Sequence, residues 1–466
     1  MSTSGYTPQP NGWRTFLVVW ATQSVSVLGS ALTHFSIIVW LTTTLYPAPG
    51  QKPQLAWALS ALSLSFALPH VIVGPLAGAW ADRHDRKRTM MAMDFASGCL
   101  STFIVALILT RQLNLPLLVV IGVLNAAFSA FHFSAFDTSY AVLVPEDRLP
   151  RANGMMETIQ ALSGILAPGL AAALIALPAL ARQGHLPSFA GSLARVTDGA
   201  ALAVGLDAVT FFLASGTLLF LHVPSPRRAD LHLESGAKKS LWADVQEGAL
   251  YIWHRRSFLW LLGTFTVVNF SIGAFVLQPL LVKFQLGPDW SARGYSFETA
   301  LALLATVASV GGVLGGIVIS ASGGLKRRRV YGVVVANIVV GLGMIVFGRS
   351  TGLYLTAGVL FVIDAMHPVM NSHSQSIWQS QTPRELQGRV FAVRRLIAQF
   401  SWPMGNFVVG LLATRFDPGL ICTVFGLGLM LWCTAMLFNP WLLRIEDKDW
   451  IEAQAAKNAG VELIRE

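Results

Sequence analysis

The sequence has few charged residues and few cysteines, and both shortages narrow what the protein can be. Only 12% of its 466 residues are Asp, Glu, Lys or Arg, whereas 54% are hydrophobic. Soluble domains carry about twice that charged fraction, so a soluble globular fold is disfavoured. Three cysteines, Cys99, Cys422 and Cys433, all lie in apolar stretches. Their spacing fits neither a metal site nor a disulfide framework, and we expect them to be packing residues.

The sequence also lacks the common motifs of catalysis. It contains no Gly-x-x-x-x-Gly-Lys-[Ser/Thr] loop, no HExxH, no CxxC and no Gly-x-Ser-x-Gly. ATP-driven pumping or hydrolysis by this chain alone is therefore not expected. His367 and His373 are six residues apart, on opposite faces of a helix, which argues against a metal pair. We predict that the protein is not an enzyme and has no cofactor or metal site.

Long apolar runs are what the sequence does have. A hydrocarbon core about 30 Å thick is crossed by about 20 apolar helical residues. Residues 1–12 are polar and uncharged, and the first apolar run is as long as a span, so no secretory signal is predicted. We predict twelve transmembrane helices, at residues 15–45, 54–80, 89–110, 115–141, 155–180, 201–222, 257–285, 298–320, 330–348, 352–380, 389–413 and 419–443.

The basic residues between these runs are unevenly distributed. With both termini on the cytoplasmic side, 25 of the 33 Lys and Arg residues lie inside and 8 outside. This bias favours that orientation. We expect the membrane to be an inner (plasma) membrane of bacterial type. It also explains the net charge of +9 without a nucleic-acid partner.

The chain divides into two similar halves. The longest polar interior segment, 223–256, separates six predicted spans from six. Each half ends its second span in a basic loop after a glycine, and in each half a loop with a proline and a glycine precedes the fifth span. We predict a cytoplasmic tail at 1–14, a six-helix bundle at 15–222, a cytoplasmic linker at 223–256, a six-helix bundle at 257–443 and a cytoplasmic tail at 444–466.

The loop between the second and third spans reads Gly-Pro-Leu-Ala-Gly-Ala-Trp-Ala-Asp-Arg-His-Asp-Arg-Lys-Arg. It resembles the signature G-x-x-x-D-R-x-G-R-[KR]-[KR] of the major facilitator superfamily, with Asp85 where that family usually has glycine. The resemblance implies an all-α membrane protein of twelve helices in two pseudo-symmetric bundles. The matching residues, which the resemblance assigns to a cytoplasmic gate, are Gly78, Asp82, Arg83, Arg86, Lys87 and Arg88.

Four further stretches resemble the drug:proton antiporter branch, which includes macrolide-efflux proteins and the enterobactin exporter. They are residues 23–30, 149–154, 207–211 and 379–391. This resemblance, rather than any periodicity, implies export of a hydrophobic or amphipathic small molecule in exchange for protons. It also implies a mid-membrane cavity lined mainly by spans 1, 4, 7 and 10. We expect the chain to work in the lipid bilayer as a monomer.

Span 10 carries the most informative polar stripe. Asp364, His367, Asn371, Gln375 and Trp378 share an arc of about 80° on a helix. Pro368 removes a backbone hydrogen bond close to the carboxylate. One hypothesis makes Asp364 and His367 a protonation or substrate site, because an ionisable group inside a bilayer usually serves function. The alternative is a buried Asp–His pair that fixes span 10 against a neighbouring helix.

Spans 1 and 4 each carry a polar and aromatic stripe. We interpret both stripes as walls of a binding cavity for large amphipathic molecules. The alternative is interhelical hydrogen bonding, worth only about 0.6 kcal/mol for each bond. The residues are Gln23, Ser26, Ser30 and His34 in span 1, and Asn125, Ser129, His132, Phe136 and Tyr140 in span 4.

The remaining charged residues and glycines receive structural interpretations. We expect Asp94 to pair with the nearby basic loop, and Asp207 to be a polar anchor between helices. Gly74 and Gly78 would permit close helix approach. Asp82 would face the start of span 11, at Gly388 and Arg389, when the cytoplasmic side is closed. Arg394 and Arg395 are expected to extend to, or pair near, the inner surface.

Two other functions remain open at this point. One is export of a siderophore or a peptide natural product, or flipping of a lysophospholipid. An anionic siderophore would require basic residues in the cavity, and the sequence places none there securely. The other is a membrane scaffold or receptor without transport activity, which the intact loop around Asp82 and the mid-span Asp364 disfavour.

Overall fold

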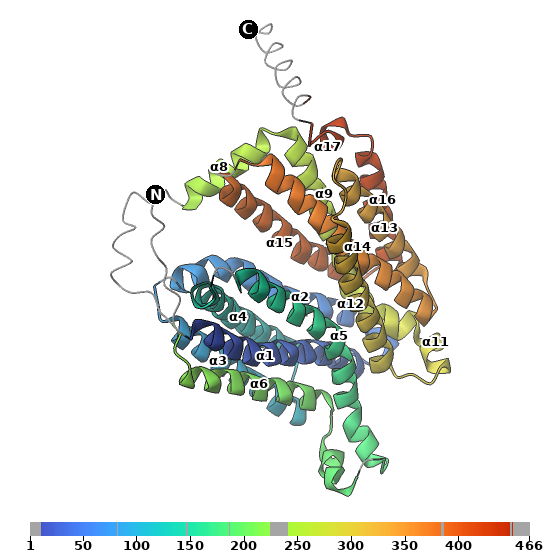
Figure 1. Ribbon diagram of the computed structural model, residues 1–466. Coiled ribbons are helices and arrows are strands. Elements are labelled where there is room, and N and C mark those ends of the chain that lie inside the picture. The colour runs from blue at the N-terminus through green and yellow to red at the C-terminus, as the bar shows by residue number, and fades with distance from the viewer. Residues whose placement is uncertain are drawn as a thin grey trace. The chain divides into compact units, whose positions relative to one another are not determined.

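The protein is built from long α-helices, as the computed structural model shows (Figure 1). The structure describes residues 11–81, 83–145, 148–185, 187–223, 241–383, 386–447 and 450. No strand occurs within these ranges. The predicted all-α class is thereby confirmed for the described residues.

By their contacts, the described residues up to 223 and residues 282–306 form one compact unit. In this first unit, α6 packs on α1 and α3, α2 packs on α4, and α5 packs on α1. Its elements are α1 (Gly12–Trp40), η1 (Leu41–Leu45), η2 (Pro49–Gln51), α2 (Lys52–Ala81), α3 (Arg86–Leu109), α4 (Leu115–Leu143), α5 (Leu149–Arg182), η4 (Ser188–Arg195) and α6 (Ala200–Phe220), joined by η6 (Leu281–Gln285) and α11 (Gly287–Ala292).

The described residues from 241 to 281 and those from 307 onward form the second compact unit. Here α13 packs on α14 and α16, and α15 packs on α8 and α9. Its elements are α8 (Leu241–Trp253), α9 (Arg256–Ile272), η5 (Gly273–Leu277), α10 (Gln278–Leu280), most of α12 (Phe297–Ser322), α13 (Val330–Arg349), α14 (Leu353–Gln381), α15 (Gln387–Leu412), α16 (Pro418–Met436) and α17 (Pro440–Leu443). The domain boundaries that the sequence suggests stay a prediction.

Eleven helical segments of the described chain are long and apolar enough to cross a membrane. They correspond to all predicted spans except span 11. That span forms the 26-residue helix α15, which is long enough but is not among the eleven. Arg394 and Arg395 lie within α15, and their charges lower its hydropathy. The predicted count of twelve helices therefore agrees with the structure once α15 is included.

Span 7 is less regular than the sequence suggests. The helix α9 passes into the 3-10 turn η5, then into α10 and the π-helical turn η6. The ammonium group of Lys283, in η6, donates to the backbone carbonyls of Thr42 and Tyr46 at the end of the first span. This contact ties the end of span 7 to the end of span 1.

The signature loop has a local structural explanation. Asp85, the departure from the family pattern, caps α3, because its carboxylate accepts a hydrogen bond from the Arg88 amide at 2.9 Å. Arg86 donates to the carbonyl of Thr138 at 3.1 Å. Asp82 lies outside the described residues, so its predicted role stays untested.

One expectation about this region is wrong. A Cβ atom added at Gly74 or Gly78 would meet nothing within 4 Å, so neither glycine serves close helix approach. The glycines that do so lie elsewhere. At Gly315, for example, an added Cβ would lie 2.3 Å from the carbonyl oxygen of Ala365, so α12 and α14 are in backbone contact there.

The polar linker contains a helix that the sequence analysis did not predict. This helix, α8, packs on α15 and α9. Glu247 of α8 forms an ion pair with Arg389 at 2.7 Å, and Tyr251 donates to the carbonyl of Gln381 at 3.4 Å. Arg389, predicted to belong to the gate around Asp82, is thus bound to the linker helix.

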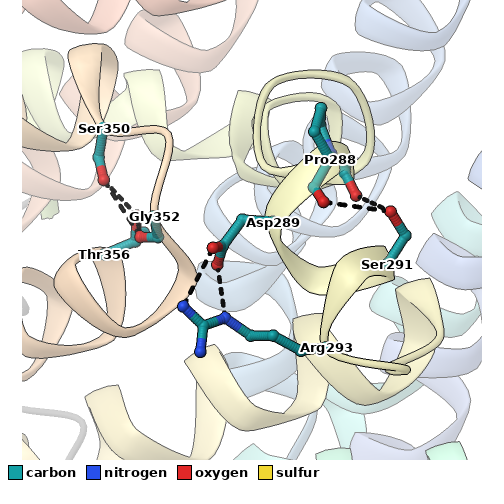
Figure 2. Close-up of polar contacts among 8 residues, drawn as sticks. Pro288, Asp289, Ser291, Arg293, Ser350, Gly352 and Thr356 are labelled. Atoms are coloured by element: carbon teal, nitrogen blue, oxygen red, sulfur yellow. Dashed lines mark hydrogen bonds and ion pairs between the residues drawn. The ribbon is translucent and has the colours of Figure 1, made fainter.

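Short loops are fixed by side-chain hydrogen bonds of their own, as Figure 2 shows. Arg293 donates two hydrogen bonds to the carboxylate of Asp289, with nitrogen–oxygen distances of 3.0 and 3.1 Å. At the start of α14, the Thr356 hydroxyl donates to Ser350 at 2.9 Å. Both contacts are local. Because the Asp289–Arg293 pair lies at the surface, away from the pockets, Asp289 is a suitable control position for substitutions of buried carboxylates.

Candidate functional site

The first unit encloses a pocket of about 440 Å³. Helices α1, α3, α4, α5 and α6 all contribute side chains to it. Its walls are mainly apolar, with aromatic rings from three helices and a methionine from α5. The residues that form these walls include Trp20, Phe133, Phe136, Met156 and Phe211. The volume falls within the usual range of about 300–1,000 Å³ for small-molecule sites.

A buried carboxylate, Asp94, lies in the wall of this pocket. Only 2% of Asp94 is exposed. The amide of Gln23 donates to its Oδ2 at 2.9 Å, and Nε2 of His132 lies 3.3 Å from its Oδ1. His132 in turn stacks on Phe136, with ring centroids 6.2 Å apart. Three helices thus bring an acid, an amide and an imidazole together inside an apolar pocket.

Several polar atoms of the same pocket have no hydrogen-bond partner. Besides Nε2 of His132, they are three groups: the indole nitrogen of Trp20 and the hydroxyls of Ser24 and Ser163, all buried within the described structure. Buried polar groups are normally paired, because leaving one unpaired costs about 1–3 kcal/mol. These three groups face a cavity in which water or a ligand can satisfy them.

A second, smaller cavity of about 30 Å³ lies beside Asp207. It is large enough for one or two water molecules. Asp207 accepts hydrogen bonds from Ser30, Thr33 and Ser101, at 3.3, 2.8 and 3.2 Å. These hydroxyls come from α1 and α3, while Asp207 belongs to α6. The prediction that Asp207 anchors neighbouring helices is confirmed.

The structure divides the predicted stripes of spans 1 and 4 between these two cavities. Gln23, Ser26 and Ser30 of α1, and Ser129, His132 and Phe136 of α4, line the larger one. His34 and Asn125 line the smaller one. The side chain of Tyr140 lies outside the described part.

The sequence interpretation of Asp94 is wrong. Its partners are Gln23 and His132, rather than the basic loop that is near it in sequence. Asp94 lies two turns inside α3, where it faces α1 and α4. Asp94 is therefore a pocket residue that the sequence analysis did not place in the predicted cavity.

In the second unit, Asp364 and His367 are neighbours on α14. Nδ1 of His367 lies 3.6 Å from Oδ1 of Asp364, and about a third of each side chain is exposed. The pair is thus neither fully buried nor fully solvated. Trp378, which the sequence places on the same stripe, is instead buried and stacks on Phe258 at 4.5 Å.

The two remaining residues of the span 10 stripe line a separate pocket of about 280 Å³ in the second unit. Arg394 donates to the Gln375 side-chain oxygen at 2.5 Å and to the Ser374 hydroxyl at 3.4 Å. It therefore points into its own unit and pairs with neutral groups. The lining residues are Phe265, Asn269, Asn371, Gln375, Phe391, Arg394 and Arg395.

Helices of membrane-spanning length around an internal pocket are compatible with a membrane transporter, and the comparison with known families decides the class. The family model of the Major Facilitator Superfamily matches residues 19–406 of the chain. The protein therefore belongs to the Major Facilitator Superfamily, whose members carry small molecules across membranes.

Characterised relatives are distant in sequence but match nearly the whole chain. Macrolide efflux protein A of Streptococcus pyogenes is 24% identical over 410 residues, which is 87% of this chain and 91% of the relative. The multidrug efflux pump Tap of Mycolicibacterium fortuitum is 24% identical over 399 residues, 83% of this chain and 88% of the relative.

Solved structures share the fold at lower identity. A bacterial homologue of the human lysosomal transporter Spinster superposes with a TM-score of 0.60 at 15% identity, covering 94% of this chain and 96% of that one. The POT family transporter PepTSo gives a TM-score of 0.64 at 13% identity, covering 93% and 99%. These likenesses confirm the fold class.

Proposed function

We propose that the protein is a secondary active transporter that exports hydrophobic or amphipathic small molecules, of drug or macrolide type, in exchange for protons. The observation that carries this proposal is the 440 Å³ pocket of the first unit, with its aromatic walls and its buried Asp94–His132 contact. Two relatives named as efflux proteins support the direction of transport.

The pocket suits substrates of this kind for a physical reason. Aromatic and apolar walls provide contact area that does not require one fixed geometry. The few polar groups, among them Trp20 and Ser163, give hydrogen bonds that orient a bound molecule. Asp94 adds an ionisable group to this wall, and ionisable groups within membrane-spanning helices commonly mark proton or substrate pathways. Proton binding and substrate binding at the same pocket can each shift the equilibrium between conformations of the protein.

We further propose that the chain acts as a monomer in a bacterial inner membrane with both termini in the cytoplasm. The threefold excess of Lys and Arg on one side of the predicted spans supports this orientation. Cysteine labelling of residues in tails and loops, with a membrane-impermeant reagent, tests it. Labelling of the tails in intact cells would contradict the proposal.

Transport is tested in everted membrane vesicles whose lumen is acidified by respiration, so that protons leave the lumen as substrate enters it. We expect vesicles with the protein to accumulate a labelled macrolide, and a protonophore to release it. Vesicles without the protein are the control. Equal accumulation in both would contradict transport and favour the receptor or scaffold alternative.

Asp364 remains a candidate coupling residue of the second unit. The sequence hypothesis predicts that Asp364→Asn abolishes proton-dependent efflux while the protein stays folded, because an amide cannot take up a proton. The measurement is substrate accumulation with and without the pH gradient. Unchanged accumulation would remove Asp364 from the coupling mechanism.

A further inference from the structure

We propose that the pocket around Arg394 in the second unit binds the anionic group of an amphipathic substrate. The inference rests on the proposed export function and specifies a class of substrate for it. Arg394 lies in α15, two turns inside the helix, and lines the 280 Å³ pocket with Arg395 and with residues of α9 and α14.

The guanidinium of Arg394 is held in a fixed position. Gln375 and Ser374 accept hydrogen bonds from its two terminal nitrogens. The rings of Trp378 and Phe265 lie 5.5 and 5.7 Å from its central carbon. These two bonds use two of the five N–H donors of a guanidinium. The remaining donors form the planar fork that matches a carboxylate, sulfonate or phosphate group.

The positive charge at this pocket has no counterion within the protein as described. Neither Arg394 nor Arg395 has an ion-pair partner among the residues that the structure places. On α14, Asp364 lies eleven residues before Gln375, about 16 Å along the helix axis, and contacts His367 instead. Two adjacent arginines in a membrane-spanning helix are costly unless something pairs with them. An anion in the pocket supplies that pairing.

The internal repeat gives an independent comparison. Arg394 follows Gly388 by six residues, as Gln160 follows Gly154 in the first half. Both side chains line the pocket of their own unit. In the first unit a neutral amide at this position is sufficient to complete the wall. The positive charge at this position is thus a property of the second-unit pocket alone, which is consistent with recognition of an anionic group.

The rest of the pocket defines the ligand further. Phe265 and Phe391 offer apolar surface beside the arginines, and the Asn371 amide adds a hydrogen-bonding group. A small inorganic anion would leave the two rings uncovered. The pocket therefore fits a ligand with an apolar or aromatic part, which covers the two rings, and one carboxylate, sulfonate or phosphate monoester, which pairs with the arginines.

A pair of matched fluorescent probes tests the inference. Anilinonaphthalene sulfonate carries a sulfonate, and N-phenylnaphthylamine has the same rings without it. We would measure the binding of each probe to the full-length protein in phosphatidylcholine nanodiscs. Arg394→Gln is expected to weaken binding of the sulfonate about tenfold or more, since it removes charge-assisted hydrogen bonds, and to leave the neutral probe within about twofold. Arg394→Lys should give an intermediate loss.

Arg349→Gln is the matched control, because Arg349 is exposed at the end of α13 in the same unit. It should change neither affinity. An equal loss for both probes, or no loss for the sulfonate, would overturn the inference. So would displacement of the sulfonate by phosphatidylglycerol added to the nanodiscs, because the anion would then be a membrane lipid head group.

Transport of the two probes separates this inference from the function on which it rests. If the protein exports both probes and Arg394→Gln stops export of the sulfonate alone, the inference is supported. If it exports the neutral probe and never the sulfonate, the inference fails while the proposed function stands. If it exports neither probe and no macrolide, the proposed function fails.

Discussion

Replacement of Asp94 by Asn should reduce proton-driven efflux by about tenfold or more, because export against a gradient requires a group that binds and releases the proton. Asn keeps the size of the side chain and can still accept the hydrogen bond from Gln23. The protein should therefore stay folded and still bind substrate. The measurement is accumulation in everted vesicles, compared with substrate exchange in the absence of a pH gradient.

Asp289→Asn is the matched control for this substitution. Asp289 is paired with Arg293 at the protein surface, where an ion pair contributes only about 0–1 kcal/mol. It should leave both efflux and exchange unchanged. Full proton-driven efflux by the Asp94 variant would show that the first-unit pocket does not carry the coupling proton, and Asp364 would then be the stronger candidate.

Substitution of Gly315 by Val should disrupt the second unit. The added Cβ would lie 2.3 Å from the Ala365 carbonyl, so α12 and α14 would have to separate. Overpacking of a tight contact typically costs about 1–3 kcal/mol, and a backbone clash has little freedom to relax. We expect a lower melting temperature and less monodisperse protein in detergent.

The next residue of the same helix supplies the control. A Cβ added at Gly316 meets nothing within 4 Å, so Gly316→Val should leave the melting temperature nearly unchanged. Equal melting temperatures for the two variants would contradict the close approach of α12 to α14. The comparison also bears on function, since Ala365 is the neighbour of Asp364.

The helices could be predicted from the sequence because the bilayer imposes a simple rule on length and polarity. Eleven predicted spans and the family assignment followed from runs of apolar residues and from the signature loop. Residues of the pocket on α1 and α4, such as Gln23 and His132, could be predicted because polar groups at helical spacing within a span rarely face lipid.

What the sequence could not give is the pairing of side chains from different helices. Asp94 was assigned to the basic loop because those charges are its neighbours along the chain, whereas its partners are 71 and 38 positions away on α1 and α4. Similarly, Arg394 is close to the predicted inner surface, and only the packing of α14 shows that it turns inward to Gln375. The direction of both side chains depends on how each helix is rotated about its own axis. In a helix that is apolar on nearly all sides, the sequence does not determine this rotation.

Lys283, which follows the linker in the chain, donates hydrogen bonds to the carbonyls of Thr42 and Tyr46. The part of the chain before the linker is therefore not expected to be structurally independent of the part after it. Residues 282–306 follow the linker in sequence but belong to the first unit by their contacts. A fragment that ends in the linker would lack them, and the backbone at the end of its first helix would lose the ammonium group that covers it. The first unit is therefore not encoded by one continuous stretch of the chain, because a segment that follows the linker completes it.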